Sequence, residues 1–243
     1  MSSPADQRRP GDAGARPALV LQHEADTPPG LLADWAAMRD VPLAVHHTYT
    51  GGAFPDVRGW SFVCCLGSSH SPLDRDVPAV ARTLELIREA VAAQVPVLGL
   101  CYGGQVLADA LGGVVGHTPE PEIGWYEVET ADAELVPAGP WLEWHYQCFT
   151  LPPGARELAR SRAGVQVFVH GPHLGTQFHP ESTIEIVLKW AAADGENLAR
   201  LGIDDAEARL EAGRARAGLA RTNAFRLFDG FWERASRAER SRQ

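Results

Sequence analysis

Apolar positions along the chain fall into short runs that alternate with segments of helical periodicity. Four short apolar runs are typical of buried strands: residues 17–22, 42–47, 59–66 and 95–100. Three segments place apolar residues at helical spacing: residues 30–38, 77–93 and 102–111. This alternation predicts an α/β fold, in which helices flank a mostly parallel sheet and ligands bind beyond the carboxyl ends of the strands.

The pattern changes after residue 113, where short alternating segments are separated by glycine. Residues 113–130 predict antiparallel strands beside the main sheet, and residues 155–178 hold three short strand candidates. The last of these, residues 174–178, precedes a helix that is predicted from about Ser182. We therefore expect a small antiparallel addition to the parallel sheet.

The segment after residue 193 is rich in Ala, Arg, Glu and Leu and predicts a C-terminal helical extension, residues 194–243. Asp204 is a suitable N-cap for a first helix over residues 206–221. Four apolar residues then follow with i, i+3, i+4, i+7 spacing: Ala224, Leu227, Phe228 and Phe231. This stripe packs back on the domain or forms a homodimer face, and a third alternative is a surface that recruits another enzyme.

Composition narrows the class of protein. The chain has 243 residues, enough for one domain over residues 17–193 with the helical extension. Its formal net charge is −9 and it has no basic stripe, which argues against nucleic-acid binding. Residues 1–16 are polar and rich in Pro and Gly, so we expect a disordered tail and neither a signal peptide nor a membrane anchor. No later apolar stretch approaches the roughly 18 residues of a membrane span.

The four cysteines show no CxxC pair and no metal-ligand spacing, so we expect no metal site and no disulfide framework. Cys64 and Cys65 lie inside an apolar run and are expected to be core side chains. A reactive thiol needs a reducing compartment, for which the cytoplasm is the default.

Cys101 lies where an apolar run passes into a helical segment. The residues around it, Gly99-Leu-Cys101-Tyr-Gly103, have the form of a sharp strand-to-helix elbow, in which glycines flank a nucleophile because a Cβ would crowd the turn. The N-terminus of the following helix favours a thiolate. A buried core cysteine is the alternative, and the elbow favours the nucleophile.

A base and an orienting carboxylate are available near the end of the α/β part. His179 and Glu181 follow the strand candidate at residues 174–178, with Pro180 between them. Residues two apart in an extended segment face the same side, so Glu181 can hold the ring of His179. The sequence therefore predicts a Cys-His-Glu triad.

These motifs resemble those of the class I glutamine amidotransferases, GxCxGxQ and HPE, and the similarity is closest to the stand-alone, GMP-synthase-like members. Residues 99–105 and 179–181 carry the motifs, and residues 124–129 and 144–155 resemble the segments between them. The resemblance spans residues 18–193. It implies a flavodoxin-like fold and hydrolysis of the glutamine side-chain amide through a γ-glutamyl thioester.

The resemblance also implies an oxyanion hole. The backbone N–H of Tyr102 is the expected first donor, and the loop at Gly67 and Ser68 supplies the second. Residues 67–72 read Gly-Ser-Ser-His-Ser-Pro where the family usually has a Gly-Gly-Pro loop, so the residue that supplies the second donor stays open.

Substrate contacts follow from the same resemblance. Gln105 matches the glutamine-binding position one helical turn beyond Cys101, and a surface glutamine is the alternative. His145, Tyr146 and Gln147 match a segment that contacts the α-amino and carboxylate groups of glutamine, although His145 could equally be a structural histidine. Four other histidines are expected in loops or strands: His70, His117, His170 and His173.

Three functional hypotheses remain open at this point. The first is a glutamine amidotransferase or glutaminase. Because no GxxxxGK[ST] or SGGxDS sequence is present, its synthetase partner is another chain, or there is none. The second is a γ-glutamyl hydrolase or peptidase with the same triad. The third is a catalytically silent binding module, whose usual signature is loss of a triad residue, and all three residues are present. None of these requires a cofactor.

Overall fold

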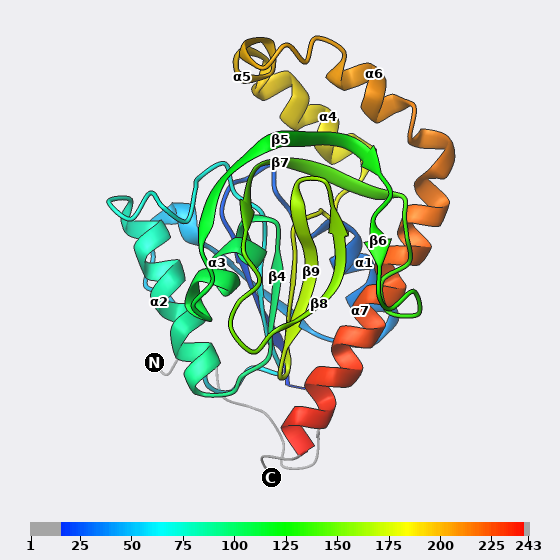
Figure 1. Ribbon diagram of the computed structural model, residues 1–243. Helices are drawn as coiled ribbons and strands as arrows, with labels where there is room; N and C mark the ends of the chain where they lie inside the picture. The colour runs from blue at the N-terminus through cyan, green and yellow to red at the C-terminus, as the bar shows by residue number, and fades with distance from the viewer. Residues whose placement is uncertain (1–15, 241–243) are drawn as a thin grey trace, which may run out of the picture.

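A computed structural model describes residues 16–240, apart from the side chain of Pro119. In this part of the chain, a central sheet is covered by helices on both faces (Figure 1). The disordered tail predicted for residues 1–16 lies outside the described residues except for Arg16.

The strands follow the order of the predicted apolar runs. Their bounds are β1 (Ala18–Gln22), β2 (Leu43–His47), β3 (Val63–Cys65), β4 (Val97–Leu100), β5 (Val115–Tyr126), β6 (Glu129–Thr130), β7 (Trp141–Phe149), β8 (Arg156–Ser161), β9 (Gly164–His170) and β10 (His173–Thr176). The helices are α1 (Gly30–Met38), α2 (Pro78–Ala92), α3 (Tyr102–Ala110), α4 (Ile184–Ala193), α5 (Gly195–Arg200), α6 (Ala206–Glu211) and α7 (Ala217–Arg240), with 3-10 turns η1 (Thr48–Thr50) and η2 (Arg214–Arg216).

The main sheet of the described residues has the strand order β2-β1-β3-β4-β10-β9-β8-β6. Strands β2, β1, β3, β4 and β10 are parallel, whereas β9, β8 and β6 continue the sheet in antiparallel fashion. A separate antiparallel pair, β5 and β7, arches over the sheet (Figure 1). The predicted α/β fold with a mostly parallel sheet and a small antiparallel addition is confirmed.

Each face of the sheet has its own layer of helices (Figure 1). Helices α2 and α3 pack on one face and α1 and α7 on the other, because strand side chains alternate between the two sides. Cys64 faces the layer of α1 and α7, and Cys65 faces that of α2 and α3. Both are fully buried free thiols, so the prediction that they are core side chains is confirmed.

The apolar stripe of α7 packs back on the domain. Its four residues are at most 1% exposed, and the ring of Phe231 lies 5.2 Å from that of Phe62 while Phe228 lies 5.8 Å from Trp35. Of the alternatives for this stripe, the structure shows the first, since the same side chains cannot also form a homodimer face or a recruitment surface. A dimer through other faces of the C-terminal helices stays a prediction.

The prediction that Asp204 is the N-cap of the first C-terminal helix is wrong. Helix α6 follows Asp205, whose side chain makes no cap hydrogen bond and instead lies 2.7 Å from Arg209. The helix ends early because Trp125 Nε1 donates to the carbonyl of Leu210 (3.0 Å) and its indole fills the space that a Cβ on Gly213 would need. The helix expected over residues 206–221 is therefore split into α6, η2 and the start of α7.

Across the described residues, no helix combines the length and the apolar character needed to cross a membrane.

Candidate active site

Cys101 occupies a strained turn between β4 and α3. Its φ is +50° and its ψ is −107°, a conformation that side chains other than glycine rarely adopt. A Cβ on Gly99 would collide with the backbone of Gly103, and a Cβ on Gly103 would collide with the carbonyl of Cys65. The glycines on both sides of Cys101 therefore permit the tight elbow that the sequence predicts.

The elbow places the sulfur at the N-terminus of α3. The backbone N–H of Cys101 donates to the carbonyl of Thr176 (3.0 Å), which joins the elbow to β10. The first backbone bond of the helix runs from the Gln105 N–H to the Cys101 carbonyl (3.0 Å), so helix geometry leaves the N–H of Tyr102 without an intrahelical acceptor. The Cys101 side chain is buried, and its Sγ lies 3.8 Å from the carbonyl of Trp144.

His179 lies between Cys101 and Glu181. Its Nδ1 lies 2.8 Å from Oε1 of Glu181, which leaves Nε2 available to interact with Cys101. Burial lowers the pKa of His179, but the neighbouring Cys101 and Glu181 outweigh burial and hold the pKa well above its ordinary value. The ring also packs against Trp190 at 4.9 Å. The three predicted triad residues are thus brought together.

The backbone of Glu181 is held by the start of α1. The N–H of Leu31 donates to the Glu181 carbonyl at 2.7 Å. Gly30 has a φ of +47°, and a Cβ there would collide with the same carbonyl. The close approach of α1 therefore fixes the carboxylate that faces His179.

The loop after β3 lies against the triad and is held by Glu24. Oε1 of Glu24 accepts hydrogen bonds from Ser68 Oγ (2.8 Å), from the Ser69 N–H (3.0 Å) and from Ser69 Oγ (2.9 Å). The N–H of His70 donates to Ser68 Oγ at 3.1 Å. The N–H groups of Ser69 and His70 are thus engaged within the protein, whereas Gly67 lies directly beside the ring of His179.

Gln105 points along α3 toward β7. Its Nε2 lies 3.4 Å from the carbonyl of Gln147 and 3.3 Å from Oε1 of Gln177. The side chain is 4% exposed and lines the cavity next to Cys101, so Gln105 is not the surface glutamine of the alternative interpretation. Gln177 Nε2 in turn lies 3.7 Å from Cys101 Sγ.

Tyr146 and Gln147 line the cavity opposite the Gly67 loop. The hydroxyl of Tyr146 donates to Oδ2 of Asp194 (2.5 Å), and Gln147 Nε2 donates to Ser71 Oγ (2.7 Å). Burial and the carboxylate of Asp194 raise the pKa of Tyr146. These bonds connect β7 to α5 on one side and to the loop before α2 on the other.

His145 is turned toward protein groups. Its Nδ1 lies 2.8 Å from the carbonyl of Gln147, and its Nε2 lies 3.1 Å from Oε2 of Glu122 and 3.4 Å from Oε2 of Glu143. Burial alone would lower the pKa of His145, but Glu122 and Glu143 raise it to about 10. Because both ring nitrogens have protein partners, the structure favours the structural histidine over the substrate contact.

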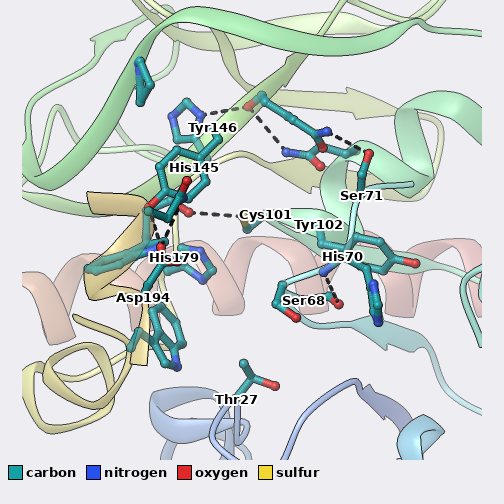
Figure 2. A pocket seen from close by; sticks show the side chains of 18 of the residues that line it. Thr27, Ser68, His70, Ser71, Cys101, Tyr102, His145, Tyr146, His179 and Asp194 are labelled. Carbon is teal, nitrogen blue, oxygen red and sulfur yellow. Dashed lines mark hydrogen bonds between the residues drawn. The ribbon is translucent and has the colours of Figure 1, made fainter. Parts of the chain in front are cut away.

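A cavity of about 900 Å³ opens next to Cys101. In Figure 2, the labelled side chains form two groups around the sulfur: His145, Tyr146, His179 and Asp194 on one side, and Ser68, His70, Ser71 and Tyr102 on the other. Four carboxylates line this cavity: Glu24, Asp26, Asp74 and Asp194. None of the described lining residues is Lys or Arg.

Several residues at the site carry no signal that periodicity or motif spacing detects. They are Glu24 after β1, Gln177 after β10, Trp190 in α4 and Asp194 between α4 and α5, and they meet only in the fold. Gln177 alone adjoins a motif, two residues before His179. Of the histidines expected in loops or strands, His70 and His117 also line the cavity.

The family profile described as glutamine amidotransferase class-I matches residues 71–186, a stretch that contains Cys101, His179 and Glu181. The chain is 31% identical over 180 residues to a putative glutamine amidotransferase-like protein, YfeJ, from Salmonella typhimurium, covering 68% of this chain and 75% of that protein. It is 42% identical over 95 residues to a GMP synthase from Aeropyrum pernix, of which the match covers 18%. The chain thus corresponds to a small part of that relative.

Solved structures show the same architecture. A glutamine amidotransferase from Thermotoga maritima is similar over 90% of this chain and 99% of its own, with a TM-score of 0.80 and 26% identity. A glutamine amidotransferase from Methylobacillus flagellatus is similar over 91% of this chain and 95% of its own, with a TM-score of 0.76 and 29% identity.

Proposed function

The chain belongs to the class I glutamine amidotransferase family, and we propose that it hydrolyses the side-chain amide of glutamine and releases ammonia. Cys101 is the nucleophile, His179 the acid and base, and Glu181 the residue that orients His179. The observation that carries this proposal is that Cys101, at a strained elbow, lines the same cavity as His179, whose Nδ1 is hydrogen-bonded to Glu181.

The first half of the reaction forms a thioester. The Cys101 thiolate attacks the carboxamide carbon, and a tetrahedral oxyanion forms. The Nε2 proton of the His179 imidazolium passes to the departing nitrogen as the C–N bond breaks. Ammonia leaves, and the γ-glutamyl group stays on the sulfur. The raised pKa of His179 supports this role, because the ring holds the proton that the leaving group needs.

The second half returns the enzyme to its starting state. Neutral His179 takes a proton from water, and the hydroxide attacks the thioester carbon. Glutamate leaves, and the Cys101 thiolate faces the imidazolium again. Glu181 keeps Nδ1 protonated throughout, so Nε2 carries out both proton transfers.

The oxyanion requires two donors. The N–H of Tyr102 is the first, since its place at the start of α3 leaves it without an intrahelical acceptor. The second comes from the N–H of Gly67 or Ser68, because those of Ser69 and His70 already donate to Glu24 and Ser68 Oγ.

Gln105, Tyr146 and Gln147 position glutamine in the cavity. The four carboxylates of the lining favour a substrate that carries an ammonium group, as glutamine does at its α-carbon. The protein acts as a cytoplasmic subunit whose ammonia acceptor is activated by a synthetase on another chain, which the similarity to the GMP synthase from Aeropyrum pernix supports.

The size of the cavity favours a second candidate. About 900 Å³ accommodates a group larger than the amide nitrogen beyond the scissile bond, which a γ-glutamyl hydrolase or peptidase requires. A silent binding module has no comparable support, since the three triad residues are present and His179 is hydrogen-bonded to Glu181.

The test uses the purified chain and measures two rates: the release of ammonia from glutamine and the release of amine from γ-glutamyl amines. The amidotransferase predicts weak glutamine hydrolysis that rises when a synthetase partner is added. Turnover of γ-glutamyl amines that exceeds that of glutamine and is unaffected by cell extract would assign the chain to the hydrolases. Ammonia release that persists in Cys101→Ala would remove the triad mechanism altogether.

A further inference from the structure

Three buried ionisable side chains meet behind the wall of the cavity. Glu122 comes from β5, and Glu143 and His145 come from β7, so the antiparallel pair brings them to one place. Their nearest side-chain oxygen and nitrogen atoms all lie within 4.8 Å of one another. Glu143 is 0% exposed, Glu122 6% and His145 2%. A group this deeply buried is stable only when its charge is compensated.

The hydrogen bond at Nδ1 determines what His145 presents to the two carboxylates. A carbonyl oxygen can only accept, so the 2.8 Å contact with Gln147 places a proton on Nδ1. Nε2 then faces Oε2 of Glu122 at 3.1 Å and Oε2 of Glu143 at 3.4 Å. In a neutral imidazole this would set a lone pair against two carboxylates. A proton, on Nε2 or on one of the carboxyl groups, or a metal ion must therefore lie between these atoms.

The cluster is short of positive partners. Neither carboxylate oxygen of Glu143 has a hydrogen-bond donor among the described residues, although both atoms are buried. The amide oxygen of Gln166, whose nitrogen donates to Glu122, is likewise buried without a donor in this part of the chain. One proton on His145 leaves two carboxylates to share a single positive charge.

We propose that Glu122, Glu143 and His145 bind a divalent metal ion, and that Zn²⁺ is the ion they fit. Zn²⁺ binds carboxylate oxygens and imidazole nitrogens, and three protein ligands with a water molecule complete a four-coordinate site. For bonds of about 2.0–2.2 Å, the edge of a tetrahedron measures about 3.3–3.6 Å. The distances from Nε2 to the two Oε2 atoms, 3.1 and 3.4 Å, are close to this edge.

The groups around the cluster are those that orient metal ligands. The Nδ1–H of His145 donates to a backbone carbonyl, which is the usual partner of a zinc-bound histidine. Ser161 Oγ and Gln166 Nε2 each donate to Oε2 of Glu122 at 2.9 Å. The ring of His145 also lines the cavity, which gives the ion and its water a route of entry.

The ion stabilises the wall of the active site and takes no part in the chemistry. It joins β5 to β7 next to Trp144, whose carbonyl lies 3.8 Å from Cys101 Sγ. The spacing of the cysteines cannot reveal this site, because its ligands are two glutamates and a histidine from two strands. The inference does not rest on the proposed function, since its test reads metal content and not activity.

The experiment titrates Zn²⁺ into EDTA-treated, full-length protein and measures heat, and it counts bound zinc by elemental analysis after dialysis. The expected result is one ion per chain with a dissociation constant below about 1 μM. Co²⁺ should give the visible absorption of a tetrahedral site.

Glu143→Gln tests the assignment to these residues, and Glu129→Gln, an exposed carboxylate on neighbouring β6, is the matched control. Glu143→Gln should weaken zinc binding by more than about 100-fold, and Glu129→Gln should leave it unchanged. Circular dichroism checks that both variants fold. A wild-type chain that binds no zinc at 100 μM, or zinc binding that Glu143→Gln does not weaken, would overturn the proposal in favour of a proton on His145 alone.

Discussion

Gly67 lies directly against the imidazole of His179: a Cβ at position 67 would be 2.8 Å from Cε1 of the ring. Real Cβ atoms do not approach this closely, so Gly67→Ala must displace the ring, the loop or both. A shift of about 1 Å in a catalytic group costs on the order of 10²-fold in rate. We predict that Gly67→Ala lowers kcat for amide hydrolysis by about that factor.

The matched control is Gly52→Ala, since position 52 has ample space for a Cβ and lies away from the cavity. It should retain the wild-type rate. Steady-state kinetics of the two variants makes the comparison, and wild-type activity in Gly67→Ala would show that the ring of His179 does not need its observed position.

His179 and Glu181 should differ in how much they contribute to the rate of amide hydrolysis. His179→Ala removes the proton donor and should lower kcat about 10³-fold or more, whereas Glu181→Gln keeps the ring in place and should cost less, about 10²-fold. The pKa of His179 should fall in Glu181→Gln, because burial lowers it and one of the groups that raise it is gone.

Proton NMR titration of the histidines measures that fall, with Glu196→Gln on the exposed surface of α5 as control. If the pKa of His179 is the same in Glu181→Gln as in the wild type, then Glu181 does not act on the ring.

Much of the fold was predictable because its signals are local. The apolar runs and glycine breaks gave the strands and helices, and Gly99 and Gly103 marked the elbow at Cys101. The early end of α6 was not predictable, because it depends on Trp125, which lies 85 residues before Leu210 in the chain. Only the folded chain brings that indole to the helix end.

The residues of the candidate site likewise fall into those that local sequence signals predict and those that only the fold brings together. Cys101, His179 and Glu181 belong to two short motifs and were predicted together, and the structure brings them to one site. Glu24 gave no signal, because a single carboxylate after an apolar run has no spacing partner, yet it accepts three hydrogen bonds from the Gly67 loop. His145 matched a substrate-binding segment, but its direction depends on Glu122 of another strand.

The C-terminal helix should contribute strongly to stability. Leu227 is fully buried on α7, so Leu227→Ala should lower the free energy of unfolding by about 2–5 kcal/mol through lost burial and a new cavity. Leu219→Ala on the same helix, where the side chain is 52% exposed, should change it by less than about 0.5 kcal/mol. Urea denaturation of both variants measures the difference, and equal effects would mean that α7 does not pack as described.

Metal-free protein should lose stability as the pH rises above 6.5. The pKa of His145 is raised to about 10 in the folded state, so its stabilising protonation is complete below the ordinary value of 6.5 and is lost as the pH rises toward 10. Between pH 7 and 8.5 the free energy of unfolding should fall by up to about 1.4 kcal/mol per pH unit.

His145→Gln cannot bind this proton and should reduce that slope, while His70→Gln, which replaces an exposed histidine, should leave it unchanged. Urea denaturation across this pH range in the presence of EDTA provides the measurement. Parallel pH curves for wild type and His145→Gln would show that His145 holds no extra proton in the folded state.

The central claim is that Cys101 attacks the γ-carbonyl of a glutamyl amide with the help of His179. It is tested most directly by treating the purified chain with a glutamine-like electrophile and locating the adduct by peptide mass spectrometry. We predict one adduct, on Cys101, that excess glutamine prevents, that Cys101→Ser abolishes and that His179→Ala slows. An adduct on the half-buried Cys148, or labelling of Cys101 that glutamine does not reduce, would contradict the account.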